Sequence, residues 1–133
     1  MIPKFRVWDK EEKTMIDWID LDMSKDGGED DFIVFEPTGP VKSAITNPIL
    51  MQSTGLKDKN GVEIYEGDIV ELKYPYDKRI KTKGSIVWDE NKACFGISME
   101  ETTEQYELYR ITAENYLTVI GNLHQNPELL EGD

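Results

Sequence analysis

Two turns and a strand lie within one continuous stretch, Gly55-Leu56-Lys57-Asp58-Lys59-Asn60-Gly61-Val62-Glu63-Ile64-Tyr65-Glu66-Gly67-Asp68-Ile69-Val70-Glu71-Leu72-Lys73-Tyr74. The Asn-Gly pair at 60–61 tolerates positive φ, so the chain can reverse there with little strain. After Gly67, apolar residues alternate with Glu71 and Lys73, which is the pattern of a strand with one wet face. Ile69 breaks this alternation, and we interpret it as a strand start covered on both faces. The stretch therefore predicts a junction between an N-terminal and a C-terminal β unit.

The N-terminal part reads as short strands separated by polar segments. Residues 4–9 and 15–21 predict a first hairpin around a polar turn. Residues 24–31 are polar and contain two glycines, which predicts a loop, and the apolar run 32–35 predicts the next strand. A short extended piece at 49–52 then ends before the central stretch.

The C-terminal part predicts a three-strand meander and a final strand. Residues 75–83 form a long basic hairpin loop, after which strands at 84–88 and 93–97 flank a turn, with Ala93 on the same face as Phe95. Residues 100–107 predict either a loop or a short helical turn.

Residues 117–122 predict the last strand, and Asn126 followed by Pro127 suits the start of a terminal helical turn. This order of strands is found in small SH3-like barrels. We therefore expect a mainly β fold, with an N-terminal β-hairpin or small sheet over residues 1–54 and an SH3-like β-barrel over residues 55–133. We expect the two units to share one compact body.

The composition is that of a folded, acidic protein. Of 133 residues, 38% are hydrophobic and 32% charged, and three Trp, six Tyr and four Phe argue against disorder. The net charge is -12, and it is spread evenly, because the residues through Glu66 and those after it each sum to -6. Such a field repels phosphate, so we do not expect nucleic acid or a membrane as a partner of the whole molecule.

The single cysteine, Cys94, excludes an intramolecular disulfide and a cysteine zinc cluster within one chain. Charged residues interrupt residues 1–20, so we expect no signal peptide, and no segment approaches the length of a membrane span. The chain fits the reducing cytoplasm.

Several motifs, in order along the chain, resemble the YopX family. They are PKFRVWD at 3–9, QSTGLKDKNG at 52–61, IYEGDIV at 64–70, VIGN at 119–122 and NPELL at 126–130. Members of this family are small proteins encoded by phages and prophages, mostly without an assigned activity. The resemblance implies a mainly β fold with an SH3-like C-terminal part and a cytoplasmic setting in a bacterial host. It implies no catalytic residues.

Catalytic and metal-binding patterns are weak. Nothing in the spacing brings Cys94 to His124, the only histidine, and we expect Cys94 to be a buried hydrophobe in a strand. Residues 22–30 superficially match a calcium loop, but the twelfth position is Ile33 instead of a bidentate acid, so we expect a solvated turn. No phosphate-binding loop or nucleophile elbow occurs. We expect no catalytic residue, no metal and no cofactor; a small enzyme with an unknown substrate is the second alternative.

The best local case for a ligand is the basic loop, where basic side chains crowd beside two tyrosines, a combination that single-strand nucleic-acid binding uses. Its candidate residues are Tyr74, Tyr76, Lys78, Arg79, Lys81 and Lys83. A lysine-rich hairpin tip also serves solubility and prevents edge pairing, and the net charge opposes nucleic acid. Nucleic-acid binding through residues 78–83 is therefore the first alternative.

The three tryptophans, Trp8, Trp18 and Trp88, form either a binding surface or part of the core. We expect the core, with Trp88 facing the barrel or its rim. The leading hypothesis is a noncatalytic accessory protein of a phage or prophage that acts through protein–protein contacts. Its partner would be a host protein, a phage protein or a second copy of the chain.

Overall fold

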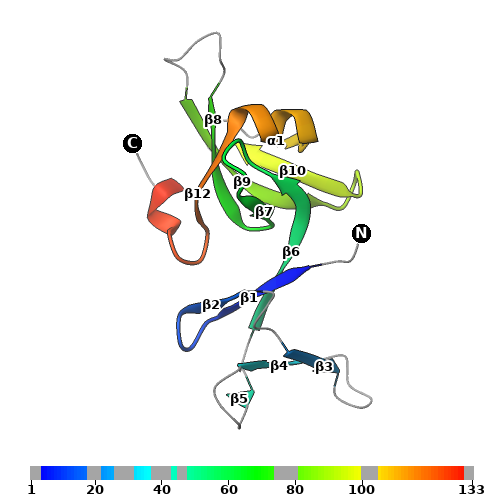
Figure 1. Cartoon of the computed structure of the whole chain (residues 1–133), viewed down its shortest axis with the longest axis vertical. Helices are drawn as coiled ribbons and strands as arrows, with labels where there is room; N and C mark the ends of the chain where they lie inside the picture. Colours follow the sequence, from blue (N-terminus) through cyan, green and yellow to red (C-terminus); the bar gives the residue numbers. More distant parts are fainter. Residues whose placement is uncertain are drawn as a thin grey trace. The chain divides into compact units, whose positions relative to one another are not determined.

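The computed structural model describes residues 4–17, 22–25, 32–36, 43–44, 48–73, 81–99 and 105–130. Within these residues the protein is mainly β, with one short α-helix (Figure 1), as the sequence predicts. The elements are β1 (Phe5–Asp9), β2 (Thr14–Ile16), β3 (Asp22–Lys25), β4 (Phe32–Glu36), β5 (Ser43–Ala44), β6 (Pro48–Lys57), β7 (Glu63–Tyr65), β8 (Asp68–Lys73), β9 (Lys81–Asp89), β10 (Cys94–Met99), β11 (Gln105–Glu107), α1 (Arg110–Tyr116), β12 (Leu117–Asn122) and a 3-10 helix (Pro127–Leu130).

The chain divides into two compact units, and the boundary between them lies inside strand β6, between Gln52 and Ser53. The first half of β6 pairs with β1, and the second half pairs with β7. The sequence placed the boundary between domains at residues 54 and 55. The expectation that both units share one compact body stays a prediction.

The N-terminal unit begins with the predicted hairpin. β1 pairs antiparallel with β2, with Val7 opposite Ile16, and both of these side chains are buried. The Asp9 carboxylate accepts hydrogen bonds from the backbone N–H groups of Glu11 and Glu12, which holds the turn. The second predicted strand, 15–21, is shorter than expected: β2 ends at Ile16, and residues 18–21 lie outside the described part of the chain.

A small antiparallel sheet of order β3-β4-β5 follows, and only β4 was predicted. β3 occupies the first four residues of the calcium-like segment, so Ser24 and Lys25 lie in a strand and not in a polar loop. Backbone pairing with the apolar strand β4 explains this, because an edge strand tolerates polar side chains.

The central stretch folds as its turn residues predict. Gly61 and Gly67 have φ values of 82° and 87°, and both turns sit where the sequence places them. Ile69, at the start of β8, is fully buried as expected. The structure differs from the prediction in the length of β6. This strand continues to Lys57, whereas the sequence predicted an extended piece that stopped after Gln52.

The C-terminal unit is built on a five-stranded antiparallel sheet of order β11-β10-β9-β8-β12. The predicted meander β8-β9-β10 and the final strand β12 are confirmed. The core of this unit is formed by Ile64, Val70, Leu72, Ile86, Ile97, Ala113 and Leu117. β11 and β12 lie at the two edges of the sheet, and the SH3-like barrel stays a prediction.

Three expectations for this unit are wrong. The basic loop does not extend to residue 83, because β9 begins at Lys81 and pairs its first residues with the end of β8. Ala93 lies in the turn before β10, with a φ of 52°, and so does not share a strand face with Phe95. Residues 105–107 form strand β11 instead of a loop or helical turn.

Helix α1 was not anticipated from the sequence. Its seven residues, RITAENY, include several poor helix formers, and no side chain caps its N-terminus. Ala113 is fully buried in the core of the unit, so tertiary packing stabilises this helix. The predicted helical turn after Asn126 is present as the 3-10 helix.

Candidate functional site

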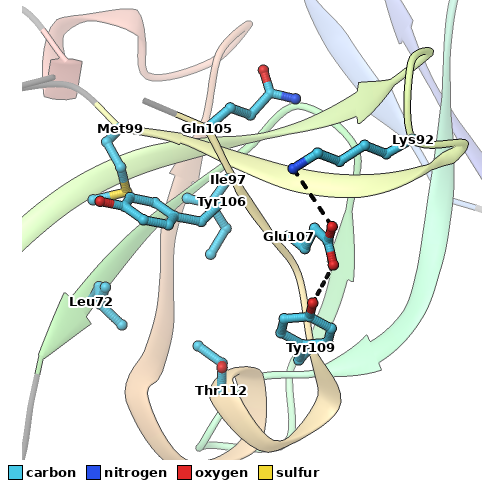
Figure 2. Close-up of a pocket in the computed structure, with 9 residues that line it drawn as sticks. All are labelled: Leu72, Lys92, Ile97, Met99, Gln105, Tyr106, Glu107, Tyr109 and Thr112. Atoms are coloured by element: carbon cyan, nitrogen blue, oxygen red, sulfur yellow. Dashed lines mark hydrogen bonds and ion pairs between the residues drawn. The ribbon is translucent and has the colours of Figure 1, made fainter. Parts of the chain in front are cut away.

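An open hollow of about 350 Å³ lies in the C-terminal unit where β8, β10, β11 and the start of α1 come together (Figure 2). We call it the β11 hollow. It is lined by Leu72, Lys92, Ile97, Met99, Gln105, Tyr106, Glu107, Tyr109 and Thr112. The hollow lies within one compact unit, so its geometry does not depend on the N-terminal unit.

The floor of the β11 hollow is part of the hydrophobic core. Leu72 and Ile97 are buried core residues, and Met99 packs against the same cluster. A ligand that entered the hollow would therefore contact apolar side chains that the core already holds in place.

One wall carries a fixed carboxylate. The Tyr109 hydroxyl donates a hydrogen bond to Oε2 of Glu107, and the Lys92 ammonium lies 3.5 Å from Oε1 (Figure 2). The hydrogen bond from Tyr109 is the main cause that lowers the pKa of the Glu107 carboxyl, and Lys92 acts in the same direction against desolvation and Asp89. The carboxylate in turn raises the pKa of Tyr109. At neutral pH, Glu107 is thus an anion that a tyrosine hydroxyl orients.

The rim of the hollow exposes large apolar side chains. Tyr106 and Tyr109 are 50% and 58% exposed, and Ile111, in the first turn of α1, is 72% exposed. Aromatic side chains that are exposed beside an apolar hollow are typical of binding surfaces. We call Tyr106 and Tyr109, which also line the hollow, the apolar rim.

A glycine positions β11 against the sheet. A Cβ atom on Gly96 would lie 2.8 Å from the Tyr106 carbonyl oxygen, closer than real Cβ contacts. The Leu108 N–H donates to the Phe95 carbonyl at 3.0 Å, which extends the pairing beyond β11. Glycine at 96 therefore lets β11 lie close to β10 and brings Tyr106 and Glu107 to the hollow.

Four of the six candidate residues of the basic loop lie outside the described part of the chain: Tyr74, Tyr76, Lys78 and Arg79. Lys81 is the first residue of β9.

Lys83, the last candidate of the basic loop, is engaged within the fold. Its ammonium donates to the Leu129 carbonyl at 3.2 Å, and its register partner on β8 is Glu71. Lys83 therefore holds the 3-10 helix against the sheet.

The other sequence candidates are dispersed. Cys94 starts β10 and is half-buried, whereas His124 lies in the turn after β12, and β9 and β8 separate these two strands in the sheet. Trp8 is buried as expected. Trp88 is 44% exposed, at the surface, with its ring edge-to-face on Phe95 at a centroid distance of 5.0 Å; Trp18 lies outside the described residues.

Among the residues that the structure describes, no three His, Cys, Asp or Glu side chains are grouped as metal ligands. In the same residues, no helix combines the length and the apolar character that crossing a membrane requires.

The β11 hollow was not predicted from the sequence, although the strand pattern of β11 was present in it. Residues 105–109 read QYELY, with apolar side chains at alternate positions, which is a strand pattern. The acidic residues before this segment masked it, and nothing in the sequence places it beside Leu72, more than thirty residues earlier.

The fold and the hollow define a small, mainly β protein whose C-terminal unit carries an open hollow among its described residues. The family model described as YopX protein matches residues 4–131, so the chain belongs to the YopX family. This confirms the resemblance inferred from the sequence motifs.

Solved structures agree with this assignment. The crystal structure of protein EF1440 from Enterococcus faecalis is 28% identical with a TM-score of 0.69, and the match covers 98% of this chain and 99% of that chain. The X-ray structure of protein yopX from Bacillus subtilis is 24% identical with a TM-score of 0.67, and the match covers 98% and 97% of the two chains. The latter likeness bears on the fold alone. No curated protein matches the chain.

Proposed function

We propose that this protein is a noncatalytic protein-interaction module and that its binding surface is the β11 hollow with its apolar rim. The single observation that carries the proposal is the exposure of Tyr106 and Tyr109 beside a hollow whose floor is core. Burial of such side chains by a partner removes apolar area from water, which is the main favourable term in protein association.

The electrostatics of the site support a binding role over a catalytic one. A general base at neutral pH works best with a pKa near 7, whereas the pKa of Glu107 is lowered. The pKa of Tyr109 is raised, so its hydroxyl stays protonated and is a poor nucleophile. Both groups suit recognition by hydrogen bonds and charge.

The resemblance to a family of phage-encoded proteins supports a proposal for the setting. We place the protein in the bacterial cytoplasm as a phage or prophage accessory protein, with a host protein, a phage protein or a second copy as its partner. The meander β8-β9-β10 with a final strand β12 supports an SH3-like description of the C-terminal unit, since this order is found in small barrels of that class.

The experiment is a pull-down from a lysate of a lysogenic bacterium that encodes the protein, with and without nuclease. The wild-type bait is compared with the double variant Tyr106→Ala/Tyr109→Ala and with the control Val62→Ala/Leu123→Ala, which also removes exposed apolar side chains. We expect a stoichiometric protein that survives nuclease, is retained by the control and is lost with the tyrosine variant.

Two results would overturn the proposal. Retention of the same protein by the tyrosine variant would place the interface elsewhere. Material that disappears with nuclease would favour the basic loop and nucleic acid. Light scattering of the purified protein tests whether the partner is a second copy of the chain. Self-association through the rim should be seen in the wild type and lost in Tyr106→Ala/Tyr109→Ala.

A further inference from the structure

The two edges of the five-stranded sheet differ in what covers them. At the β12 edge, the turn after β6 supplies partners: the Lys59 N–H donates to the Leu117 carbonyl at 3.0 Å, and the Val119 N–H donates to Oδ2 of Asp58 at 2.9 Å. At the opposite edge, β11 has β10 as its strand partner on one side, and no strand of the described residues pairs with its other side. Among the described residues this side of β11 is a sheet edge, and sheet edges can pair with a strand of another chain.

The backbone of β11 presents groups to that side. The Leu108 N–H faces β10, because it donates to the Phe95 carbonyl. Hydrogen-bonding directions alternate along a strand, so Tyr106 also faces β10, and the backbone groups of Gln105 and Glu107 point outward. An added antiparallel strand would meet donors and acceptors at these two residues.

The β11 hollow runs along this edge. Successive side chains of a strand point to opposite faces, yet Gln105, Tyr106 and Glu107 all line the same hollow. All three residues of β11 thus border the hollow, and a segment bound along β11 would lie beside it.

The carboxylate of Glu107 has capacity for a further partner. Oε2 accepts a hydrogen bond from Tyr109, and Oε1 faces the ammonium of Lys92. A carboxylate offers about four acceptor sites in all, so these two contacts do not saturate it. Lys92 is half exposed, so its ammonium can return to water. A net charge of -12 attracts cationic segments toward the protein.

We infer that the β11 edge binds an extended segment of a partner protein that carries an arginine, whose guanidinium lies against Glu107 and the exposed tyrosine rings. Arginine fits better than lysine, because its planar fork donates to both carboxylate oxygens and stacks on aromatic rings. Main-chain pairing with β11 supplies affinity, and the arginine supplies specificity. This inference rests on the proposed function and names the chemistry of its partner.

The test uses a probe peptide, acetyl-Thr-Val-Arg-Val-Thr-amide, and its twin with citrulline, the neutral isostere of arginine, in place of arginine. Both are titrated into the full chain labelled with nitrogen-15, and amide chemical shifts are followed by NMR. We expect saturable shifts at residues 105–109 and at Lys92. We also expect the citrulline peptide to bind about tenfold more weakly, since a charge-assisted hydrogen bond is lost.

Two substitutions locate the charge that matters. Glu107→Gln should weaken the arginine peptide about tenfold and remove the preference over citrulline. The matched control Glu128→Gln makes the same charge change on the exposed 3-10 helix and should leave the affinity unchanged. Equal melting temperatures of both variants show that each remains folded.

Several outcomes would overturn the inference: no shifts at β11 at millimolar peptide, equal affinity of the two peptides, or equal loss in both glutamine variants. These outcomes are distinguishable from failure of the proposed function. If a lysate protein depends on Tyr106 and Tyr109 but the arginine peptide does not bind, the proposed interaction role is supported and arginine recognition is refuted. If the peptide binds at β11 and no lysate protein is retained, arginine recognition is supported and the proposed interaction role is refuted.

Discussion

Two acidic residues sit at opposite edges of the same sheet and have opposite roles. Asp58, at the β12 edge, is 3% exposed, and its carboxylate accepts from the backbone N–H groups of Asn60, Val62 and Val119. Glu107, at the β11 edge, has a half-buried carboxylate that two side chains contact. The carboxylate of Asp58 ties the turn after β6 to β12, whereas Glu107 lies at an edge that pairs with no further strand of the described residues.

This difference indicates how one fold can separate stability from the recognition that we propose. Backbone donors held around a buried carboxylate cannot be exchanged for a ligand without unfolding the turn. Side-chain partners at the surface exchange with water at little cost. Substitutions at the two edges should therefore affect different measurements.

The largest effect is expected at the β12 edge. Asp58→Ala removes three charge-assisted hydrogen bonds and leaves their N–H groups without that acceptor, so we expect a loss of roughly 3–5 kcal/mol in the free energy of unfolding. Chemical denaturation measures this loss.

The comparator is Asp89→Ala, because Asp89 holds a similar turn by accepting from Asn91 and Lys92 but at an exposed site. We expect about 1 kcal/mol there. Equal losses at Asp58 and Asp89 would contradict the view that burial makes the Asp58 turn a structural tie.

The next effect concerns the position of β11. In Gly96→Ala, the new methyl group would meet the Tyr106 carbonyl at 2.8 Å, so β11 must shift away from β10. We expect a destabilisation of about 1–3 kcal/mol, as for overpacking. NMR shifts of residues 105–109 should change, whereas Thr118→Ala, on β12 at the opposite edge of the sheet, should leave them in place. Unchanged shifts in Gly96→Ala would show that the close approach is not required.

A smaller effect is expected at the β11 edge itself. Tyr109→Phe removes the hydrogen bond that does most to lower the pKa of Glu107, so that pKa should rise toward its ordinary value. Carboxyl NMR during a pH titration measures it. Lys92→Met should raise the same pKa as well, because the charge and the hydrogen bond of Lys92 both lower it, and Tyr116→Phe should not change it. An unchanged pKa of Glu107 in Tyr109→Phe would contradict the assigned cause.

The smallest effect is the pH dependence of stability from this pair. Because the pKa of Glu107 is lowered in the folded state, its contribution is present above the ordinary glutamate pKa and is lost as the pH falls through the lowered value. Because the pKa of Tyr109 is raised, its contribution is lost as the pH rises through the raised value. The stability difference between wild type and Tyr109→Phe should therefore be greatest near neutral pH and vanish at both extremes.

Local sequence patterns predicted turns and strands correctly where the residue types dictate the backbone conformation. Positive φ at Gly61 and Gly67, the alternation in β8 and the apolar strand β4 were all readable, because each depends on neighbours a few residues apart. The residues of β3 and β5 were not readable as strands, since they are recruited by pairing with β4.

The sequence by itself determined the mainly β class, the two turns of the central stretch, the meander and the family. The tertiary structure decided helix α1, the length of β6 and the β11 hollow. Ala113 stabilises a helix of poor intrinsic propensity only when the core of the C-terminal unit surrounds it. Leu72, Lys92 and Glu107 meet only when β8, β10 and β11 are assembled. Propensity and alternation act over a few residues, whereas a site depends on contacts between segments far apart in the chain, and no local pattern encodes those contacts.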